Sequence, residues 1–99
     1  MAFQIIWSQA AVDDLRDIVR YIATEAPDAA GRLADCVLAR LETAAEFPSS
    51  NRAVPEKADE SIREAILRPY RIVYQVDATH SAIHVLRIWH AARGIPDLR

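Results

Sequence analysis

Three side chains near the end of the chain have types suited to phosphate chemistry: Arg71, Arg87 and His90. Arginine binds phosphates and carboxylates bidentately, and histidine gives or takes a proton near neutral pH. Cleavage of RNA by its own 2'-hydroxyl needs a proton acceptor, a donor to the leaving oxygen and cations around the phosphate. The preceding loop offers Glu56 and Lys57 as a nearby acid and amine. These groups can cooperate only if the fold points Arg71 and Arg87 to one face of a sheet.

Each candidate also has a structural interpretation. Arg71 can pair with Glu64 or Asp77 on neighbouring strands, which is a contact of modest stabilising effect. His90, at the end of the last strand, can hydrogen bond to backbone, and Tyr70 can be ordinary sheet packing with its hydroxyl at the rim.

No metal site and no cofactor are expected. His80 and His84 lie four residues apart on a predicted strand, where they share a face but stand too far apart to hold one ion. Cys36, the one cysteine, has no partner for an internal disulfide.

The chain opens with a predicted strand, Phe3 to Trp7, and Ser8 is a good helix N-cap. Asp13 and Asp14 suit the N-terminal dipole of the helix that follows. That helix is amphipathic, because apolar residues recur at helical spacing: Val12, Leu15, Ile18, Val19 and Ile22.

Pro27 ends the first helix and can begin a second one, whose apolar stripe reaches Phe47. So short a connection makes the two helices antiparallel neighbours. The alanines of the stripe, with Gly31 near its start, predict close approach of the two backbones, and Cys36 is expected to be a small packing residue. Leu15 and Leu41 are expected in the core.

Residues 48 to 61 are predicted to be a loop. Three strands of an antiparallel meander follow, Ile62 to Leu67, Tyr70 to Val76 and Ala82 to Trp89. Alternation places Leu86 and Ile88 on one face of the last strand and Ile83 and Val85 on the other. The expected fold is therefore α+β, with the order β-α-α-β-β-β, an antiparallel sheet and a helical hairpin on one face, in one domain over residues 1 to 99.

Composition limits the possible partners. The net charge of -2 gives no strong basic field, so we expect no direct sequence-specific binding of nucleic acid by the chain alone. Charge is uneven, however, because residues 62 to 99 carry six arginines and three acids. The chain opens with no secretory signal and has no apolar run near the roughly 20 residues of a membrane span. We therefore expect a cytoplasmic protein without membrane contact.

The order of several short motifs resembles the ParE branch of the bacterial RelE/ParE toxin superfamily. The opening half contributes Trp7-Ser8, Asp14-Leu15, Tyr21-Ile22-Ala23 and Pro27. The closing half contributes Arg52-Ala53-Val54-Pro55-Glu56, Arg63-Glu64, Tyr70-Arg71-Ile72-Val73-Tyr74, Val85 to His90, Arg93 and Ile95-Pro96. Each motif alone is weak, and their order over nearly the whole chain carries the resemblance.

The resemblance implies the toxin of a type II toxin–antitoxin system, neutralised by a cognate ParD-like antitoxin and acting on DNA gyrase without being an enzyme. RelE-type relatives of the same fold instead cut messenger RNA, and Arg71 and His90 match positions that act there, with Arg87 able to share the role. In those relatives an aromatic residue follows the histidine, whereas this chain has Ala91, which cannot stack on a base.

Three function classes remain open at this point: a gyrase-directed toxin, which the sequence favours, a ribosome-dependent endoribonuclease, and a binding module of the same fold. For a protein that acts by binding, we expect a partner surface around the end of the last strand. Its members are Arg71, Arg87, Trp89, His90, Arg93 and Ile95.

Overall fold

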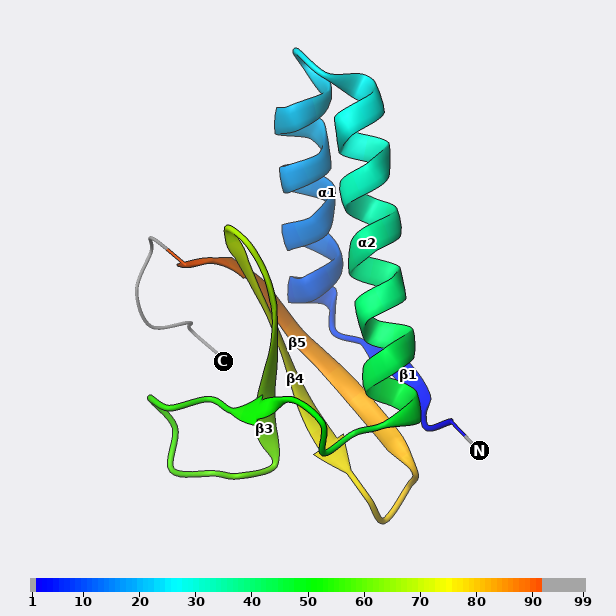
Figure 1. The fold of residues 1–99 in the computed structure, drawn as a ribbon, viewed down its shortest axis with the longest axis vertical. Helices are drawn as coiled ribbons and strands as arrows, with labels where there is room; N and C mark the ends of the chain where they lie inside the picture. Colours follow the sequence, from blue (N-terminus) through cyan, green and yellow to red (C-terminus); the bar gives the residue numbers. More distant parts are fainter. Residues whose placement is uncertain (1, 92–99) are drawn as a thin grey trace.

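The structure, a computed structural model, describes residues 2–91, which form two helices packed on a five-stranded sheet (Figure 1). The strand order is β1-β5-β4-β3-β2, with β1 parallel to β5 and the other neighbours antiparallel. The strands are β1 (Gln4–Trp7), β2 (Arg52–Ala53), β3 (Ile62–Leu67), β4 (Tyr70–Asp77) and β5 (Ala82–His90).

The α+β class and the helical hairpin on one sheet face are confirmed, with two corrections. The expected loop 48 to 61 contains the two-residue strand β2, which pairs with β3. The sheet is mixed rather than antiparallel, because β1 aligns with β5 in the parallel register Gln4 to Ala82. The β1–β5 pairing joins segments that are distant along the chain, and the two-residue strand β2 is too short to show a periodic pattern.

The helix boundaries follow from their capping residues. α1 (Gln9–Ala23) begins after Ser8, whose Oγ accepts a hydrogen bond from the Ala11 backbone N–H at 3.0 Å. α2 (Pro27–Glu46) begins at the expected proline, whose fixed φ suits the first helical position. Asp13 lies beyond the first turn of α1, so its expected interaction with the N-terminal dipole was wrong.

Burial divides the hairpin into two parts. Near the sheet, Leu41 is fully buried beside the core residues Ile72, Tyr74 and Ile83. At the other end both helices project beyond the sheet (Figure 1), where α1 has no buried residue after Ala11, whereas Ala30 near the start of α2 is buried. Leu15 packs at the margin of the core rather than inside it.

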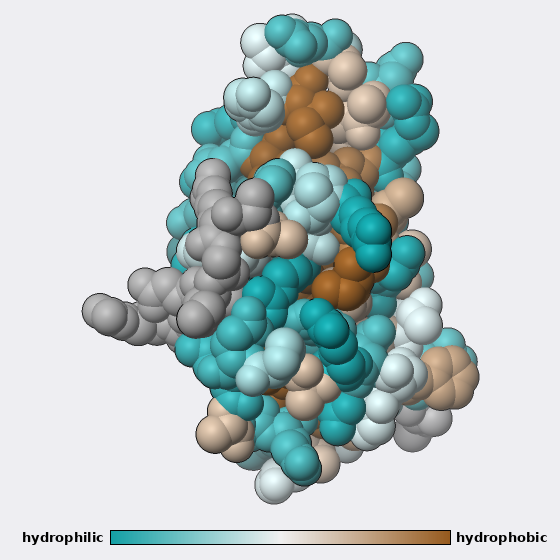
Figure 2. All heavy atoms as spheres, turned by 60° about the vertical axis from the view of Figure 1, so that its left-hand side comes forward, coloured by the Kyte–Doolittle hydropathy of each residue, from teal (hydrophilic) through white to brown (hydrophobic). Residues whose placement is uncertain are grey.

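The projecting part of the hairpin also explains two wrong predictions. A Cβ built on Gly31 would meet no atom within 4 Å, so this glycine allows no close helix approach. Cys36 is exposed rather than packed. Figure 2 shows apolar surface running along this part of the molecule, over the helices. The amphipathic pattern thus predicted the helices correctly, whereas it overestimated how much of their apolar face the chain itself covers.

A β-bulge in β5 changes which residues face the helices. Val73 pairs with Arg87 and Tyr74 pairs with Val85, so Leu86 is the extra residue. Ile83, Val85 and Ile88 therefore all join the core on the helix side. The strict alternation expected from the sequence was wrong here, because one extra residue reverses the facing of everything after it. In the part of the chain that the structure describes, no helix is long and apolar enough to cross a membrane.

Candidate functional site

Arg71 is held by two carboxylates on the sheet face that points away from the helices. Its Nη2 donates to Glu64 Oε1 of β3 at 2.6 Å and to Glu56 Oε1 at 2.8 Å. Glu64 is almost fully buried, and Arg52 contacts it from the other side at 3.2 Å. The expected pair with Glu64 is confirmed. The alternative pair with Asp77 was wrong, because Asp77 lies at the opposite end of β4.

This cluster is neutralised from within the chain. The hydrogen bonds that Arg71 donates to Glu56 raise the pKa of Arg71, so the guanidinium remains charged at any accessible pH. The same contact lowers the pKa of Glu56 below its usual value. The positive charge of Arg71 therefore faces two nearby negative charges, which reduces its attraction for a phosphate.

Arg87 is bound in a different place, at the open edge of β5. Its Nε donates to Asp14 Oδ2 of α1 at 2.7 Å and its Nη2 to Oδ1 at 2.9 Å. Asp14 also accepts the Ile88 backbone N–H at 3.0 Å, while Ser8 Oγ donates to the Leu86 carbonyl at 2.9 Å. The β1–β5 pairing ends at Val85, so this edge of β5 has no neighbouring strand after that residue. Side chains at the start of α1 form hydrogen bonds with the backbone of β5 there instead.

His90 faces the helices. It lies opposite Tyr70 in the β4–β5 register, and the two rings meet edge to face with centroids 5.5 Å apart. Arg71, the next residue of β4, lies opposite Trp89 and so points to the other face. Arg71 and His90 consequently point to opposite faces of the sheet and do not converge.

Trp89 lies on the outer face with Arg87, whose guanidinium carbon is 4.9 Å from the centre of the indole ring. The indole Nε1 is buried and has no hydrogen-bond acceptor within residues 2–91. Arg93 and Ile95, the other expected members of the partner surface, lie outside the described residues.

A shallow groove of about 450 Å³ borders the Arg71 cluster. Arg52 and Arg68 are exposed at its rim, and Arg71 contributes to its lining together with Glu56. Its lining is more basic than that of the hollow on the helix side described next. Three arginines and one glutamate line the groove. The guanidinium groups of Arg52 and Arg71 already contact Glu56 or Glu64.

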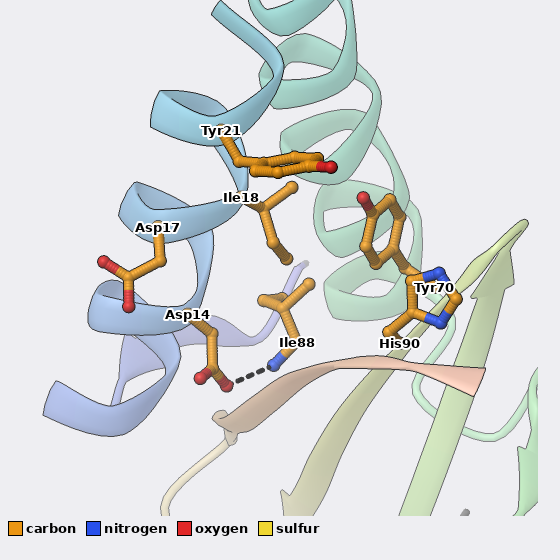
Figure 3. Close-up of a pocket in the computed structure, with 7 residues that line it drawn as sticks. All are labelled: Asp14, Asp17, Ile18, Tyr21, Tyr70, Ile88 and His90. Carbon is orange, nitrogen blue, oxygen red and sulfur yellow. Dashed lines mark hydrogen bonds between the residues drawn. The ribbon is translucent and has the colours of Figure 1, made fainter. Parts of the chain in front are cut away.

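A second hollow of about 420 Å³ lies on the helix side, between α1 and the ends of β4 and β5 (Figure 3). Sequence reasoning missed it, because its walls come from segments about fifty residues apart. The signal in the sequence was Tyr21, an aromatic residue that is 83% exposed. The hollow is lined by Asp14, Asp17, Ile18, Tyr21, Tyr70, Ile88 and His90.

The β4–β5 turn brings two histidines to one carboxylate. Asp77 Oδ2 lies 2.8 Å from His80 Nδ1 and 3.2 Å from His84 Nε2. Both contacts lower the pKa of Asp77 below its usual value, and the contact with His80 has the larger effect. The expectation that the two imidazoles stand far apart along one strand was wrong, because His80 lies in the turn. No group of three or more ligands among the described residues is arranged to hold a metal.

Comparison with known proteins identifies relatives along nearly the whole chain. The family described as "ParE toxin of type II toxin-antitoxin system, parDE" matches residues 5–95. "Toxin RelE2" of Caulobacter vibrioides is 35% identical over 91 residues, which cover 91% of this chain and 97% of that protein. "Putative toxin Y4kP" of Sinorhizobium fredii is 31% identical over 97 residues, 96% of this chain and 95% of that protein.

Solved structures show the same fold. The chain superposes on a protein of the chromosomal ParDE system from P. aeruginosa with a TM-score of 0.72 at 17% identity, over 90% of this chain and 96% of that one. It superposes on an E. coli RelE mutant, solved with a peptide of the antitoxin RelB, with a TM-score of 0.68 at 16% identity over the whole of both chains.

Proposed function

Because the chain belongs to the ParE toxin family of type II toxin–antitoxin systems, we propose that it arrests growth in the cytoplasm by binding DNA gyrase, and that a cognate ParD-like antitoxin neutralises it. One observation carries the choice of gyrase over messenger RNA. The three groups that a ribonuclease would use do not lie together. Arg71 and Arg87 are bonded to the chain's own carboxylates, and His90 lies on the opposite face of the sheet from Arg71.

The relatives' names include both branches, so they leave the target open. What supports a binding role is the surface around the end of β5. Trp89 offers a large, partly exposed ring beside the guanidinium group of Arg87, and His90 lies at the strand end. A large aromatic ring is a typical anchor of a protein interface. We propose that Arg93 and Ile95 also contribute to gyrase binding, and that Arg71 and Arg87, which are bonded to the chain's own carboxylates, support the sheet beneath this surface without contacting gyrase.

The antitoxin part of the proposal draws on the hairpin. Apolar residues of α1 beyond Leu15 are not fully covered within the described chain, and the E. coli RelE relative was solved with an antitoxin peptide. A segment that folds on binding would cover such a strip.

The test measures both activities of the purified chain in parallel. In a supercoiling assay with purified gyrase, we expect the toxin to block supercoiling of relaxed plasmid, and the antitoxin to restore it. In a translation reaction with ribosomes, we expect the message to remain intact. Site-specific cleavage of the message with unimpaired supercoiling would overturn the proposal.

Two variants sharpen the assay. Truncation after Trp89 removes the proposed gyrase surface from His90 onward and should abolish inhibition while leaving a folded chain. The double change Arg52→Ala and Arg68→Ala removes the exposed cations of the basic groove, and we expect it to leave gyrase inhibition unchanged. A ribonuclease would show the reverse order of sensitivity, because it needs cations around its phosphate.

A further inference from the structure

The hollow on the helix side combines negative charge with aromatic walls. Asp17 stands at its rim with its side chain 72% exposed, and its nearest cation, Arg16, is 4.0 Å away. Asp14, deeper inside, is already bonded to Arg87 and to the Ile88 backbone. No lysine or arginine lines the hollow among the described residues. Arg16 also pairs with Asp13 at 3.0 Å, so the carboxylate of Asp17 at the rim is only weakly compensated.

The other walls suit the body of a long basic side chain. Tyr21 and Tyr70 lie on the side away from Asp17, with the hydroxyl of Tyr21 directed toward Tyr70, and Ile18 and Ile88 form the apolar surface between them (Figure 3). A guanidinium or ammonium group binds to the face of an aromatic ring and to a carboxylate, while its methylene stem packs on apolar surface. A carboxylate would be repelled here, and a plain aliphatic side chain would leave Asp17 unpaired.

We propose that this hollow receives an arginine or lysine side chain of the antitoxin, with Asp17 as the charge partner and Tyr21 as the aromatic wall. The inference rests on the proposed neutralisation by an antitoxin and adds the chemistry by which that partner is recognised. Tyr21, which lines the hollow, lies near the end of α1 that projects beyond the sheet (Figure 1), so a segment covering the apolar strip reaches the hollow.

Arg71 and Arg87 belong to the partner surface expected from the sequence, where acids of a partner would suit them. Both guanidinium groups, however, already contact carboxylates of this chain. At the hollow the exposed carboxylate belongs to this chain, so the partner must contribute the positive charge there.

The experiment uses the full chain and the purified protein encoded by the reading frame beside its gene, with affinity measured by titration calorimetry. We expect Tyr21→Ala to weaken binding roughly tenfold or more, as loss of an interface anchor does. Asp17→Asn should weaken it roughly threefold to fivefold at low salt and reduce its salt dependence. Asp35→Asn, the same charge change at an exposed position of α2 outside the hollow, should leave the affinity unchanged.

A double-mutant cycle identifies the side chain that enters the hollow. Each arginine and lysine of the partner is changed to glutamine, and one of these changes should have a smaller effect in Asp17→Asn than in the wild type. Equal affinity of wild type, Asp17→Asn and Tyr21→Ala would overturn this inference while the antitoxin proposal stands. A gain of affinity in Asp17→Asn would mean that the partner presents negative charge to the hollow and would also overturn it. Absence of binding by the wild type would refute the antitoxin proposal itself.

Discussion

The outer face of the sheet and the projecting part of the helical hairpin use their side chains in opposite ways. On the sheet, Arg71 is enclosed by Glu56 and Glu64, although arginine was the residue type that first suggested chemistry. On the hairpin, Tyr21 and Asp17 are mostly exposed around a hollow. The ion-paired side chains therefore stabilise this small fold. Free energy for binding another protein is available instead from the side chains that remain exposed.

The largest expected difference between the two regions is in core packing. Leu41→Ala, at the sheet end of the hairpin, removes a fully buried side chain and should lower the free energy of unfolding by about 2 to 5 kcal/mol. Leu38→Ala, three residues earlier and 45% exposed, should cost less than about 0.5 kcal/mol. Urea unfolding followed by circular dichroism measures both. Similar losses for the two variants would contradict the division of the hairpin.

A smaller effect is expected at the junction of the two regions. Asp14→Ala removes the acceptor for both Arg87 and the Ile88 backbone N–H, and should destabilise the chain by about 1.5 to 3 kcal/mol. Asp17→Ala, one turn along the same helix and exposed, should change stability by less than about 0.5 kcal/mol. The same unfolding measurement compares them, and equal costs would mean that Asp14 does not secure the edge of β5.

The smallest effect is the pH dependence of the sheet cluster. The hydrogen bond from Arg71 lowers the pKa of Glu56 in the folded state, so its contribution to stability is complete above the unfolded pKa of about 4.3 and is lost as the pH falls through the lowered folded pKa. Glu56→Gln should therefore show a shallower loss of stability between pH 5 and pH 3, roughly the range of this titration. Identical slopes for the two proteins would show that the Arg71 contact is not maintained in solution.

The sequence predicted what depends on local pattern. Apolar spacing identified both helices, Ser8 and Pro27 marked their first turns, and the three-strand meander followed from β propensity and turn residues. Contacts between distant segments escaped it. Asp14 and Arg87 are 73 residues apart, and nothing near either residue indicates that they meet at the open edge of a strand.

The candidate site was harder to predict than the fold because of one backbone feature. Register determines whether His90 and Arg71 can share a substrate, and register depends on the pairing of β4 with β5, including the extra residue Leu86. The hollow likewise depends on how far α1 projects past the sheet, which follows from three-dimensional packing rather than from the amphipathic pattern.

We propose that Arg71 supports the fold and takes no part in chemistry, and replacing the whole charge cluster tests this role. The triple variant Arg71→Met, Glu56→Gln and Glu64→Leu removes the arginine together with both of its carboxylates, so no buried charge is left unpaired and a folded protein is expected. The measurement is growth arrest on expression without antitoxin, with circular dichroism of the purified variant confirming the fold. We expect this variant to arrest growth as strongly as the wild type. A folded variant that no longer arrests growth would contradict it and return Arg71 to the active groups.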